Sequence, residues 1–244
     1  MTSAMDRIRI FLFTISLYLW TLIIGGIIGW PALFLPRGYA IFIQTSWGRG
    51  TIFLLRVLCG IRFEVRGLDR VPEGAVLIAS KHQSAWDTFI FLLHFKAPTF
   101  IFKKELLRIP IYGWICLKTG MVPIDRQGGA AALKAMLRGA AERIGEGRSI
   151  VIFPEGTRVK PGSKMPYNPG VAGLYKHLGV PVVPVALNSG MVWPKGGVIR
   201  TDAMIRLEYL EPILPGSDKA SFLTTLESRI EDASLRLLAE GVDR

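Results

Sequence analysis

Residues 81–88, with the sequence KHQSAWDT, combine a histidine and an aspartate, two side chains that act together in proton transfer. The segment follows an apolar run at 75–79 and places His82 five positions before Asp87. Five residues carry a regular helix well past one turn, but the pair can meet if His82 lies in a loop and Asp87 in the first turn of a helix begun by Ser84. Asp87 would then bind one imidazole nitrogen and leave the other free as a general base for a hydroxyl or thiol. By itself, this spacing also fits a histidine that merely ends a strand.

Residues 153–158, with the sequence FPEGTR, form a second candidate site, where an apolar strand-like run ends in a charged turn. Pro154 fixes φ and removes a backbone donor where the strand must stop. Gly156 lets the backbone approach a ligand closely, with a carboxylate and a guanidinium on either side. An exposed turn at a strand end explains an isolated hexapeptide equally well, and it is the first segment that favours a site.

Basic side chains near other predicted strand ends could complete one cleft, because ligands of α/β folds gather beyond the carboxyl ends of strands. Arg126 and Arg158 suit a phosphate, which arginine binds by paired hydrogen bonds, and Lys103 would add a point charge. Lys104 fits equally well an exposed charge at a strand end. Glu155 and Thr157 are expected to brace the turn and orient the substrate. The expected substrate-binding residues are therefore Lys103, Lys104, Arg126, Glu155, Gly156, Thr157 and Arg158.

A His-x4-Asp segment followed about seventy residues later by FPEGTR resembles the glycerolipid acyltransferase family, most closely the bacterial 1-acyl-sn-glycerol-3-phosphate acyltransferases. Two further blocks match the family, GMVPIDR at 120–126 and VPVVPV at 180–185. The family also uses a run like FKKEL at 102–106 next to its acceptor site. One position departs from the family pattern: Asn often precedes the histidine, and here Lys81 would add a positive charge beside the base.

The resemblance implies an enzyme that transfers a fatty acyl group from an acyl thioester to the free hydroxyl of 1-acylglycerol 3-phosphate, giving phosphatidic acid. His82 would remove the hydroxyl proton, and Asp87 would hold the imidazole ring. Acyl-CoA or acyl carrier protein would be the acyl donor, and neither a cofactor nor a metal is expected. Two alternatives stay open: the same chemistry on glycerol 3-phosphate or a lyso-aminolipid such as lyso-ornithine lipid, and a non-catalytic lipid-binding membrane protein.

The composition favours a membrane contact and an anionic partner. Half of the 244 residues are apolar, and the mean hydropathy is +0.36. The net charge of +11 and the pI of about 10.0 suit an acidic lipid surface, an acidic carrier protein or nucleic acid. Nucleic acid is disfavoured because the basic residues are scattered without a recognisable reading motif. The two cysteines and three histidines show neither a disulfide framework nor metal-ligand spacing, so a reducing cytoplasmic setting is expected.

The first 62 residues read as a membrane anchor. Residues 10–36 contain no charged side chain, and their 27 positions would make a helix of about 40 Å, longer than a hydrocarbon core of about 30 Å. Three glycines and Pro31 interrupt the second half, so a helix at 8–24 followed by a break or hairpin fits as well as one span. A second apolar segment, 40–61, carries two arginines that could snorkel to headgroups.

The family resemblance favours helices embedded in one face of the membrane over two full spans. A cleaved signal peptide is disfavoured, because the apolar run is too long and no small-residue cleavage site follows it. We expect the bacterial inner membrane, with the active site facing the cytoplasm, although the flanking positive charges leave the orientation undecided.

From residue 63 onward, apolar strand-like runs alternate with helical patterns, which predicts an α/β fold with a mostly parallel or mixed sheet covered by helices. The expected strands lie at 63–66, 75–79, 99–102, 121–124, 149–153, 182–187 and 204–210. Apolar stripes at helical spacing predict helices over 133–144 and 222–237, the second capped by Ser217 or Asp218. The chain thus divides into membrane-anchoring helices, residues 1–62, and an acyltransferase domain, residues 63–244.

Overall fold

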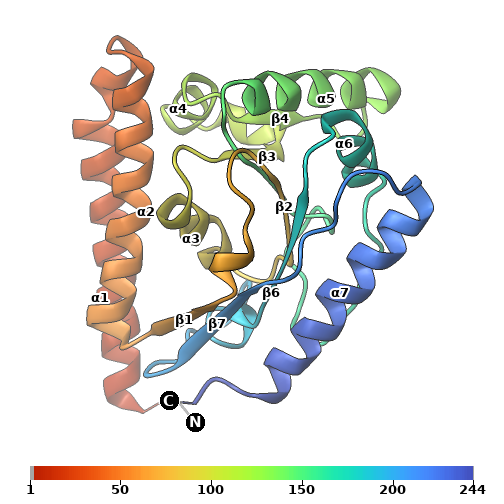
Figure 1. The fold of residues 1–244 in the computed structure, drawn as a ribbon. Helices are drawn as coiled ribbons and strands as arrows, with labels where there is room; N and C mark the ends of the chain where they lie inside the picture. Colours follow the sequence, from red (N-terminus) through yellow and green to blue (C-terminus); the bar gives the residue numbers. More distant parts are fainter. Residues whose placement is uncertain (1–2, 244) are drawn as a thin grey trace.

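The protein is built around a seven-stranded mixed sheet, seen in a computed structural model that describes residues 3–243 (Figure 1). The strand order is β1-β7-β6-β2-β5-β3-β4, and the strands from β6 to β4 in this order run parallel to one another, whereas β7 pairs antiparallel with β6 and parallel with β1. The strands are β1 Arg62–Arg66, β2 Leu77–Ser80, β3 Thr99–Lys103, β4 Val122–Ile124, β5 Ile150–Ile152, β6 Val182–Leu187 and β7 Met204–Tyr209. The predicted α/β fold is confirmed, and each expected run overlaps a strand, with ends that differ by at most two residues.

Helices cover both faces of this sheet, which explains why the central strands are apolar on both sides. Every residue of β2 and β6 is buried. Successive residues of β2 belong to hydrophobic clusters on opposite faces of the sheet. Ile78 lies in the same cluster as Trp86, and Leu77 lies in the same cluster as Leu226. The helices after β1 are α3 Trp86–His94, α4 Tyr112–Lys118, α5 Gly129–Gly145, α6 Gly170–Leu178 and α7 Lys219–Ala239, with 3₁₀ turns at Leu68–Arg70, Lys104–Arg108 and Ser189–Met191.

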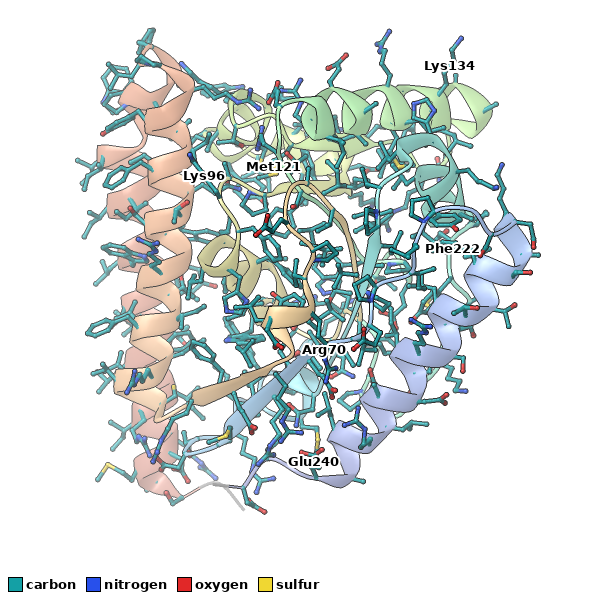
Figure 2. All side chains as sticks on the ribbon, viewed as in Figure 1. Arg70, Lys96, Met121, Lys134, Phe222 and Glu240 are labelled. Carbon is teal, nitrogen blue, oxygen red and sulfur yellow. The ribbon has the colours of Figure 1, made fainter. Side chains whose placement is uncertain are left out.

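The two predicted amphipathic helices are α5 and α7. Asp218 caps α7, because its carboxylate accepts hydrogen bonds from the backbone N–H groups of Ala220 and Ser221. Phe222 points from α7 into the core (Figure 2), where its ring stacks on Tyr175 of α6 with the centroids 3.9 Å apart. Most of each predicted stripe is ordinary core: Met136 and Ala140 of α5 and Leu226 and Ile230 of α7 are buried, whereas Leu133 on α5 is 36% exposed.

The N-terminal segment forms a helical hairpin that lies along one side of the molecule (Figure 1). Helix α1, Ala4–Thr21, continues as a π-helical stretch, Leu22–Ile28, and a 3₁₀ turn, Trp30–Leu33, before α2, Arg37–Cys59, returns. The expected interruption therefore lies where the glycines and Pro31 predicted it. The α-helical part begins earlier than the predicted 8–24 and ends at Thr21, and with its π-helical continuation the apolar helix runs to Ile28. The stretch Ala4–Ile28 is long and apolar enough to cross a membrane, with a mean hydropathy of 2.1 and 11% of its most apolar window buried.

The hairpin shares its core with the rest of the protein. Phe13 of α1 and Leu55 of α2 are buried in the same cluster as Trp86 of α3. At the open end of the hairpin, Arg9 pairs with Asp202 at 2.5 Å. The division into residues 1–62 and 63–244 stays a prediction, and the ends of these ranges, residues 1–2 and 244, lie outside the described residues.

Candidate active site

The carboxyl ends of the parallel strands bring the predicted site residues to one edge of the sheet. His82 follows β2 by two residues, the turn at 153–158 follows β5, Lys103 ends β3, and Arg126 lies two residues beyond β4. Because β2 lies between β6 and β5, His82 is flanked by the loops that follow these two strands. Parallel pairing is therefore the reason that residues far apart in the sequence share one site.

His82 and Asp87 make the predicted contact, with Nδ1 of the imidazole 3.0 Å from Oδ2 of the carboxylate. The helix that carries Asp87 begins at Trp86 and not at Ser84, because the Asp87 carboxylate turns back to accept the backbone N–H groups of Gln83, at 2.7 Å, and Ser84, at 2.8 Å. A carboxylate that accepts these bonds requires the proton on Nδ1 of His82. The other imidazole nitrogen, Nε2, is then the basic one.

Asp87 is fixed from a second side by Ser189, which follows β6. The Ser189 hydroxyl donates a hydrogen bond of 2.5 Å to Oδ1 of Asp87, and both side chains are buried. Both carboxylate oxygens therefore have donors, as a buried ionised carboxylate needs. This arrangement holds the His82 ring in one orientation.

The backbone and ring of His82 are held independently of Asp87. Its N–H donates to Oε2 of Glu155 at 2.9 Å, and its carbonyl oxygen accepts from the N–H of Val159 at 2.8 Å. The ring stacks on Phe153, with the centroids 3.9 Å apart and the planes 18° from parallel. The His82 side chain remains 15% exposed, so it is fixed but still accessible from the pocket described next.

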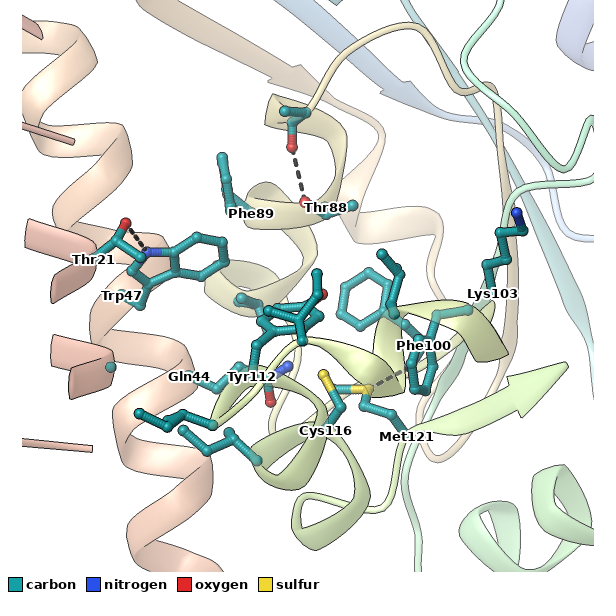
Figure 3. Close-up of a pocket in the computed structure, with 18 of the residues that line it drawn as sticks. Thr21, Gln44, Trp47, Thr88, Phe89, Phe100, Lys103, Tyr112, Cys116 and Met121 are labelled. Carbon is teal, nitrogen blue, oxygen red and sulfur yellow. Dashed lines mark hydrogen bonds between the residues drawn. The ribbon is translucent and has the colours of Figure 1, made fainter. Parts of the chain in front are cut away.

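A pocket of about 830 Å³ lies between the hairpin, α3, α4 and the strand ends. His82 and the turn residues Gly156, Thr157 and Arg158 line its polar part, together with the basic side chains Lys103, Arg126 and Lys195. Its remaining walls are largely apolar and include Phe89, Phe100, Tyr112, Cys116 and Met121 (Figure 3). Such a pocket suits an amphiphilic ligand with an anionic group near His82 and a long apolar portion.

The four basic residues predicted to bind substrate do not all reach this pocket. Arg126 and Arg158 line it, and Lys103 lines it while its ammonium lies 3.7 Å from Glu105. Lys104 is not among the described residues of the pocket wall, because it forms an ion pair with Asp125 instead. This placement favours the alternative interpretation of Lys104 as a charge at a strand end.

Glu155 is placed differently from the prediction that it contacts substrate. Its side chain is 0% exposed, with Oε2 on the His82 N–H and Oε1 2.6 Å from Nζ of Lys81. Burial raises the pKa of the Glu155 carboxyl above its usual value, although the Lys81 ammonium and the His82 N–H act in the opposite direction. Glu155 therefore braces the turn, and the expectation of a substrate contact is wrong, because the carboxylate is enclosed beneath the loop.

The Lys81 ammonium also lies away from the position expected of it. Consecutive side chains at the end of a strand point to opposite faces, so Lys81 points to the α7 face while His82 points to the pocket. The predicted positive charge beside the base is absent: two carboxylates, Glu155 and Glu231, neutralise Lys81.

Gly156 has the conformation that the turn requires. Its φ of +69° lies in the left-handed region, and a Cβ atom there would come within 2.9 Å of Nδ2 of Asn168. Asn168 in turn donates from its side chain to the carbonyl oxygen of Pro154 at 3.0 Å. The turn is therefore braced from beneath by Asn168, while Gly156 and Thr157 line the pocket.

Several residues of the site and its support were not selected from the sequence, among them Ser189, Lys195 and Glu231. Ser189 follows an apolar strand, so the rule that ligands gather at strand ends could have found it. Glu231 and Lys195 carry no such signal, because a single charge on an amphipathic helix or in a loop is ordinary.

The other two histidines, His94 and His177, lie outside the described wall of this pocket. His94 contacts the Tyr209 hydroxyl at 2.7 Å, and burial lowers its pKa to about 4, so the ring is neutral near pH 7. His177 is exposed on α6. Among nearby aromatic residues, Trp86 is core, Phe89 lines the pocket, and Trp114 is half exposed and lies outside the described pocket wall.

Comparison with known proteins gives the same picture as the geometry. The model of the Acyltransferase family matches residues 62–188, which include both site segments. A 1-acyl-sn-glycerol-3-phosphate acyltransferase of Pseudomonas aeruginosa is 38% identical over 80% of this chain and 76% of its own length. A protein of the same name from Helicobacter pylori is 31% identical over 74% of this chain and 79% of its own.

A solved structure extends the likeness to the whole fold. The 1-acyl-sn-glycerophosphate (LPA) acyltransferase PlsC of Thermotoga maritima matches with a TM-score of 0.75 and 25% identity, over 96% of this chain and 98% of that one. The matched length includes the N-terminal hairpin as well as the sheet. With its two site segments at one edge of such a sheet, this chain belongs to the acyltransferase family.

Proposed function

We propose that this protein transfers a fatty acyl group from an acyl thioester to the free hydroxyl of 1-acylglycerol 3-phosphate, giving phosphatidic acid. One observation carries the proposal: an oriented His82 and four cationic side chains line the same pocket, whose other walls are largely apolar. This combination fits an acceptor with one hydroxyl, one phosphate and one hydrocarbon chain. The names of the Pseudomonas aeruginosa and Helicobacter pylori relatives support the same acceptor.

The reaction begins with proton removal by His82. Nε2 takes the proton of the acceptor hydroxyl as its oxygen attacks the thioester carbonyl carbon, and the Asp87 carboxylate stabilises the imidazolium that forms. The tetrahedral intermediate then expels the thiolate, which receives the proton back from His82 and leaves as a thiol. Phe153 and Glu155 keep the ring and backbone of His82 in place throughout these steps.

The attack is direct, without an acyl-enzyme. Cys116 is a thiol in the pocket wall, but burial raises its pKa to about 11, which keeps it protonated and a poor nucleophile near pH 7. No cofactor or metal takes part in this proposal. The thioester donor is acyl-CoA or acyl carrier protein, both anionic, and the net charge of +11 favours the approach of either.

Thiol release in the presence of different acceptors tests the proposal. The purified full-length protein is mixed with an acyl thioester and with 1-acylglycerol 3-phosphate, glycerol 3-phosphate or a lyso-aminolipid. We expect rapid release only with 1-acylglycerol 3-phosphate, with phosphatidic acid identified by mass spectrometry. Release with another acceptor alone would replace the proposed substrate, and no acceptor-dependent release would favour a non-catalytic lipid-binding protein.

The substitution Arg126→Ala is expected to raise the KM for 1-acylglycerol 3-phosphate, with little change in the KM for the thioester. Loss of one charged hydrogen bond to the phosphate should cost about 1.5 to 3 kcal/mol, roughly ten- to a hundredfold in kcat/KM. Arg158→Ala should cost at least as much, because Arg158 also belongs to the turn that holds His82 in place. Steady-state kinetics with each substrate varied in turn measures both effects.

Lys104→Ala is the matched control for this series. It removes a nearby cation that pairs with Asp125 and does not line the described pocket, so both KM values should stay near those of the wild type. An increase in the thioester KM alone for Arg126→Ala would assign that arginine to the donor and remove support for a phosphate-bearing acceptor.

We propose that the hairpin embeds the protein in the cytoplasmic leaflet of the bacterial inner membrane. There the active site would be accessible to acyl-CoA or acyl carrier protein from the cytoplasm. Large apolar side chains are exposed along α1, the hairpin tip and α2. Such a surface is far more apolar than a water-soluble face, and residues of the hairpin form one wall of the pocket, so a lipid acceptor could enter from the bilayer.

Replacing exposed apolar residues of the hairpin by serine should release the protein from membranes while leaving it folded. The chosen positions are Phe11, Leu19, Phe34 and Phe53, which are exposed, lie outside the described pocket wall and avoid the core residues Phe13 and Leu55. Each contributes roughly 1.5 to 3 kcal/mol of burial in the hydrocarbon, so the fourfold variant should move to the supernatant of carbonate-washed membranes.

Lys134→Ser on α5, far from the hairpin (Figure 2), controls for a general change in surface polarity. It should stay with the membranes. Release of the wild type by salt alone would mean that charge and not apolar burial holds the protein there.

A further inference from the structure

A buried ion-pair network lies on the opposite face of the β2 strand end from the pocket. Nζ of Lys81 lies 2.6 Å from Oε1 of Glu155 and 2.6 Å from Oε1 of Glu231 on α7. The Tyr167 hydroxyl donates to the same oxygen of Glu231 at 3.0 Å, and the Ser163 carbonyl oxygen lies 3.4 Å from Nζ. Lys81 is only 1% exposed and therefore touches no substrate.

This network joins two distant parts of the chain to the catalytic loop. Lys81 immediately precedes His82, Glu155 belongs to the turn after β5, and Glu231 lies in the C-terminal helix. Glu155 is shared: Oε1 forms an ion pair with the Lys81 ammonium at 2.6 Å, and Oε2 accepts a hydrogen bond from the backbone N–H of His82. The position of His82 therefore depends on a carboxylate whose own position depends on Lys81.

We propose that Lys81 is a positioning residue for the acyl transfer, holding the Glu155 carboxylate on the His82 N–H while Glu231 holds Lys81. The inference rests on the proposed function for its assay, but not on the identity of the acceptor. Lys81 also stands where the family pattern often has Asn.

The charge of Lys81 is what keeps Glu155 an effective acceptor. Burial and the nearby Glu231 carboxylate raise the pKa of Glu155, and the Lys81 ammonium lowers it. The groups that face Glu155 are Lys81, Glu231, Tyr167 and the His82 N–H, and Lys81 is the one cation among these. Without it, the pKa of Glu155 would be higher, and a protonated carboxyl would accept the His82 N–H more weakly.

The test measures kcat and both KM values of full-length Lys81→Met between about pH 7 and about pH 9.5. We expect kcat to fall about tenfold at the lower pH with both KM values unchanged, since Lys81 touches neither substrate. The sign of the pH effect follows from the removed cation: the pKa of Glu155 rises, so the carboxyl is neutral at low pH and ionises as the pH increases. The deficit relative to the wild type should therefore shrink toward about twofold at the upper pH.

Glu231→Gln is the matched control within the same network. The amide oxygen still accepts from Lys81 and Tyr167, so Lys81 stays in place and the ratio of kcat to that of the wild type should not change with pH. Both variants are expected to lower the midpoint of thermal unfolding, because each removes a partner from a buried ion pair. The pH-dependent deficit of Lys81→Met thus separates positioning from a purely structural loss.

Lys81→Gln covers the case that the methionine variant does not fold. It keeps a donor for Glu155 without the charge and should show the same pH-dependent deficit. A folded variant with wild-type kcat at every pH, or with the same fractional loss at every pH, would overturn the proposal. A wild type that does not acylate 1-acylglycerol 3-phosphate would instead contradict the proposed acceptor, and the comparison would then use the acceptor that supports turnover.

Discussion

The substitution His82→Ala is expected to lower kcat by about 10³- to 10⁴-fold, because it removes the base that takes the acceptor proton. The side chain lies at the pocket wall and is partly exposed, so its loss should change the free energy of unfolding little. Acceptor binding should persist, since the cations and the apolar walls remain. Thiol release and the thermal unfolding midpoint, measured on one preparation, separate the two effects.

His177→Ala provides the control for this substitution, because His177 is exposed on α6 and lies outside the described pocket wall. Its turnover should equal that of the wild type. Near-normal turnover by a folded His82→Ala protein would contradict the proposed mechanism.

Asp87→Asn has the second-largest expected effect, a loss of about 10²- to 10⁴-fold in kcat. An amide can place only one oxygen toward the donors that now meet the carboxylate: the Ser189 hydroxyl, two backbone N–H groups and the His82 ring. The amide also lacks the charge that stabilises the imidazolium. The ring would lose the partner that keeps its proton on Nδ1, and Nε2 would no longer be reliably basic.

Ser189→Ala is the milder companion, since it removes one donor and keeps the charge of Asp87. Its cost should be that of one hydrogen bond to a charged group, about 1.5 to 3 kcal/mol, shared between stability and kcat.

Because His82 and Asp87 act as a unit, the double variant with both His82→Ala and Asp87→Asn should be little slower than His82→Ala alone. Fully multiplicative losses would show that the two residues work independently.

The strands and the two principal site segments could be predicted from the sequence because each rests on local chemistry. The seven apolar runs are β-strands whatever their order, and Pro154 and Gly156 dictate a turn at the end of β5. The pairing of His82 with Asp87 also depends on a short local loop. The fold class followed from the alternation of runs, although the antiparallel placement of β7 did not.

The site predictions that the structure does not support concern the direction of charged side chains at strand ends. Lys104 was expected at the substrate and pairs with Asp125, and Glu155 was expected there and lies buried on Lys81. The face of the sheet that receives such a side chain is set by the exact residue at which the strand ends. A shift of one residue reverses it, and composition does not resolve that difference.

The sequence by itself determined which chemistry this protein can perform: a base with its carboxylate, a charged turn, and an apolar N-terminal segment. Only the tertiary structure decided how these parts are held. Ser189 donates a hydrogen bond to Asp87, Glu231 forms an ion pair with Lys81, and the hairpin forms one wall of the pocket. The reason is physical. Local motifs fix the backbone through neighbouring residues, whereas a buried charge is stabilised by whatever partner the packing of distant elements brings within hydrogen-bonding distance.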